Sequence, residues 1–373
     1  MILRKLNLYQ FRNYERTTVE FSEGTNFIIG KNAQGKTNIL ESIYYASYGK
    51  SFRNNKDSQL VKEGHEKSYF SVDYDHDYGS STIEVKLLLE NKKEIRINHQ
   101  PVKKTSEILG EFLAVIFSPD DLKIIKEGPV LRRRFLDREI SQISRNYYHY
   151  LIQYQRVLEL RNNYLKKNNE KSCDLIYLET INEQLIENGM KVVKKRIDYV
   201  EKLNDIIKEV HHRISEEKEV LKIAYVSPII KHKDRDYDKI EEEYKRILNE
   251  KLSVDLKNNY TSAGPHRDEI SILIDGKDLK IFGSQGQIRT ATLSLVIGVM
   301  KITHRIVGEK PLLLLDDVFS ELDDDRKNIL LDYVKDYQTF ITATDLSGIH
   351  LDKINDYQIY EVEEGKIRRR SFQ

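Results

Sequence analysis

The feature that most constrains the fold is a glycine-rich loop near the start of the sequence, Gly30–Thr37, which reads GKNAQGKT. The short apolar segment 25–29 precedes the loop, and residues 38–46 after it repeat apolar side chains at helical spacing. A strand, a loop of this pattern and a helix form the context of a phosphate-binding P-loop. Glycine allows the backbone N–H groups to turn toward phosphates, and a helix N-terminus favours an anion. The loop therefore predicts a nucleotide-binding protein.

Each part of this loop has an expected role in holding ATP and Mg²⁺. The ammonium group of Lys36 would neutralise phosphate charge, so it is a candidate catalytic residue, and the hydroxyl of Thr37 would bind Mg²⁺. The backbone would enclose the β- and γ-phosphates. The candidate ATP-binding residues are Gly30, Lys31, Asn32, Ala33, Gln34, Gly35, Lys36 and Thr37.

Length and composition limit the class of protein. A chain of 373 residues, 39% hydrophobic and 32% charged, is expected to form two domains with a substantial core. Cys173 is the single cysteine, which excludes an internal disulfide and a cysteine metal cluster. No apolar run is expected to span a membrane, and the first residues lack a signal-peptide pattern. We therefore expect a cytoplasmic protein without membrane contact. The net charge of +1 gives no argument for nucleic acid, so any DNA surface requires local clusters.

Two strand-rich regions flank a helical one. Alternating residues predict strands within 1–29, joined by a turn at Phe11–Tyr14 that either lies near the nucleotide or is an ordinary turn. An antiparallel sheet is predicted over 66–100 and a buried strand over 112–117. Apolar spacing over 130–217 predicts two antiparallel helices, each about 55–65 Å long at 1.5 Å per residue, separated by the polar stretch 166–172. Further predicted elements are a strand at 221–226, a helix at 238–256 and strands at 270–274, 312–315 and 339–343.

The apolar segment Leu312–Leu315 ends in two carboxylates, Asp316 and Asp317. A central parallel strand that ends in this way is typical of a Walker B motif, because ligands bind at the carboxyl ends of such strands. Asp316 would hold Mg²⁺ through water, and Asp317 would orient or deprotonate the attacking water. The alternative is a buried strand that ends at a polar turn.

A second anion site is predicted at the N-terminus of a helix over 288–299. The preceding residues Ser284, Gln285, Gly286 and Gln287 resemble the signature motif of ABC-type ATPases. In those proteins this motif contacts the γ-phosphate of ATP bound to the other subunit. The alternative is an ordinary helix cap.

Taken together, these motifs resemble the RecF family of bacterial recombination and replication-repair proteins. Besides the P-loop, the resemblance rests on the segments 117–122, 131–137, 264–268 and 316–323, which read FSPDDL, LRRRFLD, GPHRD and DDVFSELD. It implies an α/β fold with an ABC-type ATPase head, built from a mixed sheet with a P-loop core and an antiparallel sheet, and an inserted short helical lobe. The expected domains are a head half at 1–122, a helical lobe at 123–256 and a second head half at 257–373.

The resemblance also implies an activity and partners. Proteins of this family dimerise on ATP, bind single- and double-stranded DNA, act with RecO and RecR to help load the RecA recombinase at gaps, and take part in SOS induction. By position, Lys36, Thr37, Asp316 and Asp317 match the phosphate, metal and hydrolytic residues, and Ser284 with Gly286 matches the contact in trans. Aspartate replaces the usual glutamate at 317, Thr344 stands where transporters place histidine, and Ser118-Pro119 replaces the metal-sensing glutamine. These departures predict slow hydrolysis, with ATP acting as a timed clamp.

Several basic clusters are candidates for DNA contact, which requires positive charge placed against phosphates. The candidates are Lys50, Arg53 and Lys56, then Arg132, Arg133 and Arg134, then Lys191, Lys194, Lys195 and Arg196, and the tail Arg368-Arg369-Arg370. For each cluster the alternative is a solvated face, and for Arg134 it is pairing with Asp137 or Glu139. No aromatic-rich base-reading motif is present, so backbone contacts with little sequence preference are expected. Two other functions remain open, a P-loop metabolic kinase or nucleotidyl enzyme and the ATPase subunit of a transporter.

Overall fold

The computed structural model describes residues 1–53, 56–168, 173–230 and 236–370. The chain divides into two compact units. The first comprises Met1–Lys123, Glu209–Glu219 and Ser284–Gln373, and the second comprises Ile124–Lys208 and Val220–Gly283. The first unit therefore draws on both ends of the chain, as the α/β prediction required. The sequence analysis placed the return to the head at residue 257, whereas residues 257–283 belong to the second unit and 209–219 to the first.

The first unit contains a six-stranded sheet in the order β15-β14-β3-β13-β12-β8. All neighbours pair in parallel except β14 and β15. Three of the predicted strands, which lie at 114–117, 312–316 and 339–343, are buried along their length, which explains their continuous apolar sequences. The strands are β3 (Thr25–Ile29), β8 (Ala114–Phe117), β12 (Leu312–Asp316), β13 (Thr339–Ala343), β14 (Tyr357–Glu363) and β15 (Lys366–Arg369).

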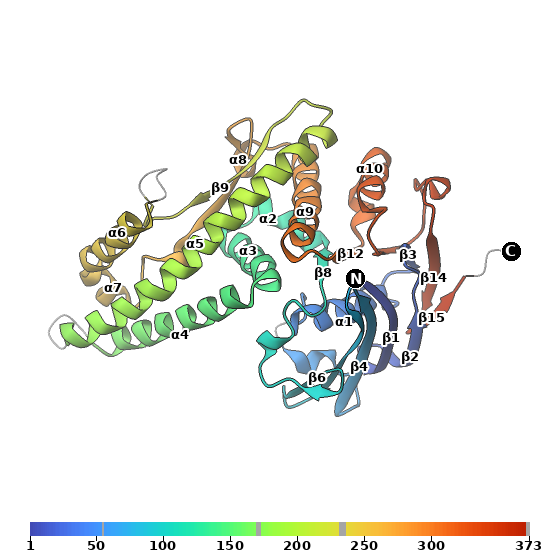
Figure 1. Ribbon diagram of the computed structural model, residues 1–373, viewed down its shortest axis with the longest axis horizontal. Coiled ribbons are helices and arrows are strands. Elements are labelled where there is room, and N and C mark those ends of the chain that lie inside the picture. The colour runs from blue at the N-terminus through green and yellow to red at the C-terminus, as the bar shows by residue number, and fades with distance from the viewer. Residues whose placement is uncertain (54–55, 169–172, 231–235, 371–373) are drawn as a thin grey trace. The chain divides into compact units, whose positions relative to one another are not determined.

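The second sheet of this unit is antiparallel, in the order β2-β1-β4-β5-β6-β7. One face is buried and the other is polar, so its strands alternate in the sequence as predicted for 66–100. Figure 1 shows these strands in blue and cyan. They are β1 (Ile2–Phe11), β2 (Tyr14–Glu20), β4 (Lys67–His76), β5 (Gly79–Leu88), β6 (Lys93–Ile97) and β7 (Gln100–Pro101).

Three helices complete the first unit, α1 (Lys36–Tyr48), α9 (Gln285–Val307) and α10 (Asp324–Val334). Helix α1 contacts β4 of the antiparallel sheet and β8, β12 and β13 of the parallel sheet, so it lies between the two sheets. Helix α9 is long and apolar enough to cross a membrane by length and composition, contrary to the expectation that no such segment exists. Because 72% of its most apolar window is buried inside the protein, it has the burial of a core helix.

The second unit is mainly helical and carries a small sheet in the order β11-β10-β9. Its elements are α3 (Pro129–Ile143), α4 (Arg145–Lys167), β9 (Leu221–Val226), α6 (Tyr237–Glu250), α7 (Leu252–Asn258), β10 (Glu269–Ile274), β11 (Lys277–Asp278) and α8 (Leu279–Phe282). Helices α2 (Pro119–Lys126) and α5 (Leu175–Ile214) each begin in one unit and end in the other. Short 3₁₀ turns occur at Asp57–Leu60, Thr105–Glu107, Pro265–Arg267, Val318–Glu321 and Leu351–Lys353.

The helical arm differs from its prediction in one respect. Its first half is two helices, because Ser144 is extended and its side chain accepts the N–H of Tyr147, which ends α3 and starts α4. Helix α4 is thus about 35 Å long and α5 about 60 Å at 1.5 Å per residue. Arg161 of α4 donates to Asn182 of α5 at 2.7 Å, which joins the two arms. Of the polar stretch predicted between them, residues 169–172 lie outside the described residues.

Two further differences concern the C-terminal half. The helix predicted at 238–256 is divided at Lys251 into α6 and α7. The arginine tail is part of an edge strand, since β15 pairs with β14 through Arg369 opposite Tyr360 and Arg368 opposite Glu361. Arg369 also donates to the side chain of Gln358 at 2.6 Å, while the side chains of all three arginines stay exposed.

Candidate nucleotide site

The glycine-rich loop connects β3 to α1, in the context that its sequence predicted (Figure 1). Its two glycines have positive φ angles, 154° at Gly30 and 113° at Gly35. A Cβ atom at Gly35 would lie 2.5 Å from the amide nitrogen of Asn13, and one at Gly30 would meet the carbonyl oxygen of Val362. Side chains are therefore excluded at both positions, and the loop can form the tight turn of a phosphate cradle.

Lys36 is the first residue of α1 and is only 7% exposed. Its ammonium group donates to the carbonyl oxygens of Gly30 at 2.6 Å and Lys31 at 3.0 Å. Burial lowers the pKa of Lys36, while the nearby charges of Asp317 and Asp316 act in the opposite direction. If a phosphate bound here, the ammonium group would exchange its neutral carbonyl acceptors for a charged oxygen, which forms a stronger hydrogen bond.

The next residue connects the loop to the second motif. The hydroxyl of Thr37 donates to Asp316 Oδ1 at 2.8 Å, and the hydroxyl of Thr342 on β13 donates to the same oxygen at 2.9 Å. Asp316 is 6% exposed at the end of β12. Burial raises the pKa of this carboxyl group, and its hydrogen bonds with Thr37 and Thr342 partly offset the rise. The two predicted metal residues therefore meet at one point.

Asp317 follows directly and has a left-handed backbone, with φ 52° and ψ 25°. Its N–H donates to the hydroxyl of Thr342 at 2.8 Å. Thr342 thus contacts both aspartates of the motif, because it binds the side chain of Asp316 and the backbone of Asp317. The chain turns sharply after β12, so Asp317 lies just beyond the strand end. Its hydrolytic role stays a prediction.

These residues fit ATP and Mg²⁺. A hydroxyl and a carboxylate oxygen only 2.8 Å apart are the hard oxygen donors that Mg²⁺ uses when substrate phosphates complete its coordination. A buried carboxylate with a raised pKa and a buried ammonium group with a lowered pKa are both stabilised when an ion of opposite charge arrives. Thr37 and Asp316 would hold the metal, and Lys36 with the loop amides would hold the phosphates.

Two turns from opposite ends of the chain fix the position of the loop. The amide of Asn13 donates to the carbonyl of Gln34 at 2.7 Å, and the hydroxyl of Tyr14 donates to that of Gly35 at 3.0 Å. On the other side, the N–H groups of Glu364 and Gly365 donate to Gln34, at 2.6 Å to its side chain and 3.3 Å to its carbonyl. The turn at Phe11–Tyr14 therefore lies beside the loop, the first of the two alternatives considered.

The predicted signature residues begin α9. Ser284 accepts the N–H of Gln287 at 3.2 Å, and the side chain of Gln287 accepts the N–H of Ser284 at 2.9 Å, which is a complete capping box. Ser284 and Gln285 are exposed, and a Cβ at Gly286 would have room. The residues thus form a helix cap in which Ser284 and Gln285 are exposed and Gly286 and Gln287 are half-buried. A contact with ATP of a second chain stays a prediction.

The segments that depart from general ABC patterns also have defined structures. Ser118 follows β8 and directly precedes α2, and its N–H and hydroxyl donate to Asp121 in the first turn of that helix at 2.8 and 3.0 Å. Asp323 caps α10 by accepting the N–H of Arg326 at 3.0 Å. Thr344 follows β13 and is exposed, as a residue at this edge of the sheet would be. The side chain of Glu321 lies outside the described residues.

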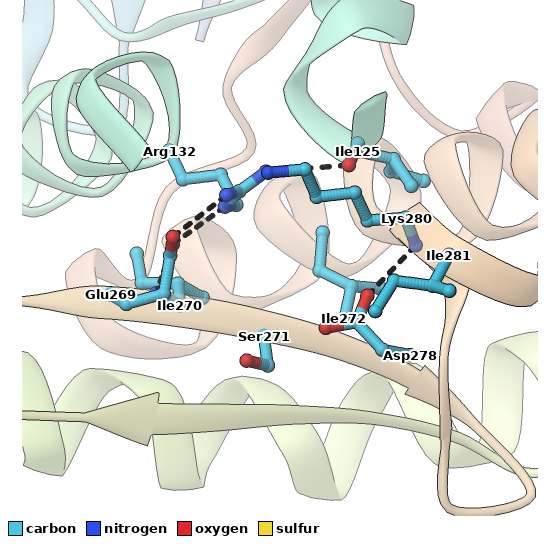
Figure 2. A pocket seen from close by; sticks show the side chains of 9 residues that line it. All are labelled: Ile125, Arg132, Glu269, Ile270, Ser271, Ile272, Asp278, Lys280 and Ile281. Atoms are coloured by element: carbon cyan, nitrogen blue, oxygen red, sulfur yellow. Dashed lines mark hydrogen bonds and ion pairs between the residues drawn. The ribbon is translucent and has the colours of Figure 1, made fainter. Parts of the chain in front are cut away.

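Arg132 is not a DNA contact, contrary to the sequence-based candidate. It is 4% exposed, and its guanidinium forms two hydrogen bonds with Glu269, at 2.7 and 2.8 Å (Figure 2). The same group donates to the carbonyls of Ile124 and Glu127 at 2.9 and 2.8 Å, which satisfies the C-terminal end of α2. Arg132 also lines a pocket of about 230 Å³. Lys280 and Asp278 line the same pocket (Figure 2).

The other candidates divide in the same way. Arg196 is buried, with Asp137 at 2.8 Å and the carbonyl of Pro265 at 2.7 Å, so it is also structural. Arg133 is half-buried and donates to the carbonyl of Asp268 at 2.7 Å. Arg53 donates to Asn38 at 3.3 Å and opposes the rise in the pKa of Asp316, which places it beside the nucleotide site. Lys50, Lys56, Arg134, Lys194 and Lys195 are exposed, and Lys191 is bonded to Glu187 at 2.7 Å.

Sequence reasoning missed the residues that orient this site. Thr342 stands in the apolar strand segment 339–343, and a hydroxyl inside such a strand next to a Walker B motif is a signal that could have been used. Arg12 forms two hydrogen bonds, both 2.8 Å, with the fully buried Glu41 of α1. This ion pair fastens the turn before Asn13 to the helix of the P-loop, and nothing in the spacing of the two residues predicts it.

The family model described as the RecF/RecN/SMC N terminal domain matches residues 2–367. The chain is 43% identical over 366 residues to the DNA replication and repair protein RecF of Clostridium tetani (strain Massachusetts / E88), covering 98% of this chain and 99% of that protein. It is 42% identical over 368 residues to the DNA replication and repair protein RecF of Alkaliphilus oremlandii (strain OhILAs), covering 98% and 100%.

A solved structure of the recombination mediator protein RecF-ATP in the RecFOR pathway superposes with a TM-score of 0.92. It is 40% identical, and the match covers 99% of this chain and 98% of that one. The Smc head domain with an extended coiled coil from Pyrococcus furiosus matches with a TM-score of 0.58 at 16% identity, over 100% and 96% of the two chains. The second likeness concerns the fold alone.

Proposed function

This chain belongs to the RecF family of DNA replication and repair proteins, and from that premise we propose that it is a DNA-binding repair factor controlled by ATP. ATP with Mg²⁺ would hold two copies together, and slow hydrolysis would release them. The observation that carries this proposal is the junction of Thr37, Asp316 and Thr342, where the P-loop and the Walker B strand share one carboxylate oxygen.

The residues of one chain would bind and orient the nucleotide. Lys36 neutralises the phosphates, and Thr37 with Asp316 holds the metal that shields their charge. Asp317 would accept a proton from the attacking water or orient it. Because aspartate is one methylene shorter than the usual glutamate, its carboxylate reaches less far from the backbone, which supports slow turnover. ATP then acts as a timed clamp.

The site of one chain would be completed by a second copy. Ser284, the N-cap of a 23-residue helix, and the following Gln285 are exposed at the surface. Such a helix terminus favours an anion. With the γ-phosphate of a partner-bound ATP against it, the hydroxyl of Ser284 would exchange its capping bond for a bond to phosphate. This arrangement would make dimerisation depend on the triphosphate.

The pathway assignments follow from the family. We propose that the protein binds DNA, in single-stranded, duplex or gapped form, acts with RecO and RecR, helps load the RecA recombinase and contributes to SOS induction. A solved relative at 40% identity is described as a recombination mediator in the RecFOR pathway, which supports this placement. Action in the cytoplasm, without a membrane, is part of the same proposal.

Sedimentation velocity tests the proposal directly. The purified chain is measured without nucleotide, with ADP and with ATP and Mg²⁺, each with and without a gapped duplex, at several salt concentrations. We expect a single chain without nucleotide and with ADP, and a dimer with ATP and Mg²⁺. The DNA-bound form should sediment faster, and DNA affinity should decrease as the salt concentration rises. A metabolic kinase would bind ATP but would neither dimerise nor bind DNA. That result would exclude an ATP-dependent dimer that acts as a clamp.

A further inference from the structure

The outer face of the antiparallel sheet in the first unit carries a row of four residues, here called the tyrosine row. Tyr9 of β1 lies between Arg16 of β2 and Tyr69 of β4. Tyr69 in turn lies opposite Lys86 of β5. Residues directly opposite one another point to the same face of a sheet. The adjoining row is buried in the core and consists of Leu8, Thr17, Phe70 and Val85.

Both tyrosines are available at the surface. The side chain of Tyr9 is 40% exposed, and Tyr69 is half-buried. The hydroxyl of Tyr69 donates to Glu84 at 3.0 Å, which restrains the ring. Carboxylates on this face already have partners, since Glu84 accepts this bond and Asp73 accepts the hydroxyl of Thr82 at 2.7 Å. The row is thus an aromatic surface whose acidic neighbours are engaged.

Cations stand at both ends of the tyrosine row. Arg16 is exposed and has no ion-pair partner in the part of the chain that the structure describes. Lys67, two residues before Tyr69 on the same face, is likewise exposed and unpaired among the described residues. Lys86 is 3.1 Å from Glu94, but the two side chains are 40% and 52% exposed. An exposed ion pair of this kind contributes little to stability, so Lys86 can exchange Glu94 for a phosphate. With strands about 4.8 Å apart, the row spans roughly 14 Å between its terminal cations.

We propose that the tyrosine row binds single-stranded DNA, with unpaired bases stacked on Tyr9 and Tyr69 and phosphates against Arg16 and Lys86. Aromatic side chains flanked by positive charge are the means by which proteins hold single strands without reading their sequence. A duplex keeps its bases stacked inside and could use only the cations. A second copy of this chain is the poorer fit, because the neighbouring side chains Asn7, Thr18 and Ser71 are polar and hydrogen-bonded to one another.

This surface is linked to the nucleotide site by one β-hairpin. Tyr9 and Arg16 stand on either side of the turn that joins β1 to β2, and residues of that turn hold the P-loop through Asn13 and Tyr14. The inference rests on the proposed DNA-binding function and names the strand form and the surface. The sequence alone gave no such motif, because the two tyrosines are far apart in the chain and only the register of β1 with β4 brings them together.

A tryptophan reporter tests the site. The chain contains no tryptophan, so Tyr9→Trp introduces a single tryptophan that can be excited at wavelengths where tyrosine does not absorb. Its fluorescence is quenched when a base stacks on it. We expect quenching by oligothymidylate and none by a blunt duplex of equal length. Equal quenching by the duplex would overturn the assignment to single strands. Binding of oligothymidylate without quenching would remove the site and leave the DNA function standing, whereas no binding of any DNA would remove both.

Substitutions supply the second measurement, by fluorescence anisotropy of labelled oligothymidylate. Tyr9→Ala is expected to weaken binding about fivefold to a hundredfold, the range for loss of one stacked base, and Tyr9→Phe to keep wild-type affinity. Tyr78→Ala is the matched control, since Tyr78 is 92% exposed between β4 and β5, outside the row. Thermal unfolding of each variant separates lost contact from lost folding. Wild-type affinity in folded Tyr9→Ala would overturn the proposal.

Discussion

The hydroxyl of Thr37 donates to a carboxylate oxygen of Asp316 across 2.8 Å, although 279 residues separate them in the sequence. The carboxylate is buried at the end of β12, and its pKa is raised because burial disfavours its charge. Burial of a charged carboxylate costs free energy unless an opposite charge lies beside it. In our proposal, a bound metal ion supplies that charge.

Asp316→Asn separates stability from function. The ionised carboxylate is disfavoured by burial, so above its raised pKa it destabilises the empty protein relative to the neutral form. We expect the amide to keep the bonds from Thr37 and Thr342 and to raise the free energy of unfolding at neutral pH by about 1 kcal/mol. Mg²⁺-dependent ATP binding should be lost. Calorimetry with ATP in Mg²⁺ and in EDTA measures the loss of Mg²⁺-dependent binding. If ATP affinity of the variant still depended on Mg²⁺, Asp316 would not be a metal ligand.

The same carboxyl group predicts a pH dependence. Protons compete with Mg²⁺ for Asp316, and its raised pKa means that protonation begins at a higher pH than for an exposed aspartate. As pH falls from neutral, the Mg²⁺-dependent part of ATP affinity should therefore decrease before ordinary carboxylates titrate. Titrations with a fluorescent ATP analogue between about pH 4 and 8 measure it. Asp316→Asn serves as the reference, because in this variant ATP affinity should be the same with and without Mg²⁺ at every pH.

Lys36→Ala should abolish detectable ATP binding. The ammonium group is buried beside Gly30, and charge-assisted bonds to phosphate are worth about 1.5–3 kcal/mol each, so affinity should fall by at least tenfold to a hundredfold. Lys31→Ala is the control, because that side chain is exposed in the same loop. Equal losses for both lysines in an equilibrium binding assay would show that general charge, and not the position of Lys36, is responsible.

Ser284 offers a substitution that keeps its structural role. Aspartate caps helices as well as serine does, so Ser284→Asp should preserve α9 while placing a negative charge where the γ-phosphate of a partner is expected. ATP binding by the single chain should be unchanged, and the ATP-dependent dimer should be absent in light scattering. Ser284→Arg should also block dimerisation, by bulk. A dimer of normal mass in both variants would refute the contact in trans.

Asp317→Asn tests the hydrolytic role. The amide cannot accept a proton, so turnover should fall by about a hundredfold or more while ATP still binds. Because the Asp317 backbone N–H bonds to Thr342, the turn itself should be retained. An ATP-bound dimer should then accumulate, visible by sedimentation over hours. Wild-type phosphate release would remove Asp317 as the catalytic base.

Arg132→Ala should reduce stability and not DNA affinity as such. Removal of the guanidinium takes two hydrogen bonds from Glu269, which keeps the bond from the N–H of Ile270, and removes the donor to the carbonyls at the end of α2, at a cost of about 3 kcal/mol. Arg134→Ala, two residues away and exposed, should change unfolding by less than about 0.5 kcal/mol. Denaturant unfolding compares the two.

Local patterns were sufficient for most of the nucleotide site. The P-loop and the Walker B strand each place their own residues, since a tight turn and a buried parallel strand are determined by neighbouring residues. Asp316 and Thr37 were expected to share a metal and do lie together. Thr342 was missed, and the contact of Asn13 with Gln34 was not predicted, because these contacts come from strand register and from turns that meet across the first unit.

Arginine was the residue that sequence reasoning judged least well. Arg132 and Arg196 read as surface charge, but each is buried against a carboxylate distant in the sequence, Glu269 and Asp137. The sequence of a basic cluster does not indicate burial when its acidic partners are distant in the chain and approach only in the tertiary structure. Strand β14 was missed for a related reason, since its partner β3 stands near the other end of the chain.

That last pairing has a consequence for biosynthesis. The strand that leads into the P-loop is flanked by β13 and β14, whose residues leave the ribosome more than three hundred positions later. At about 5–20 residues per second, β3 waits on the order of 15–60 s for both neighbours. We therefore expect the nascent chain to complete its ATP cradle, and so to bind nucleotide, only after β13 and β14 have been synthesised.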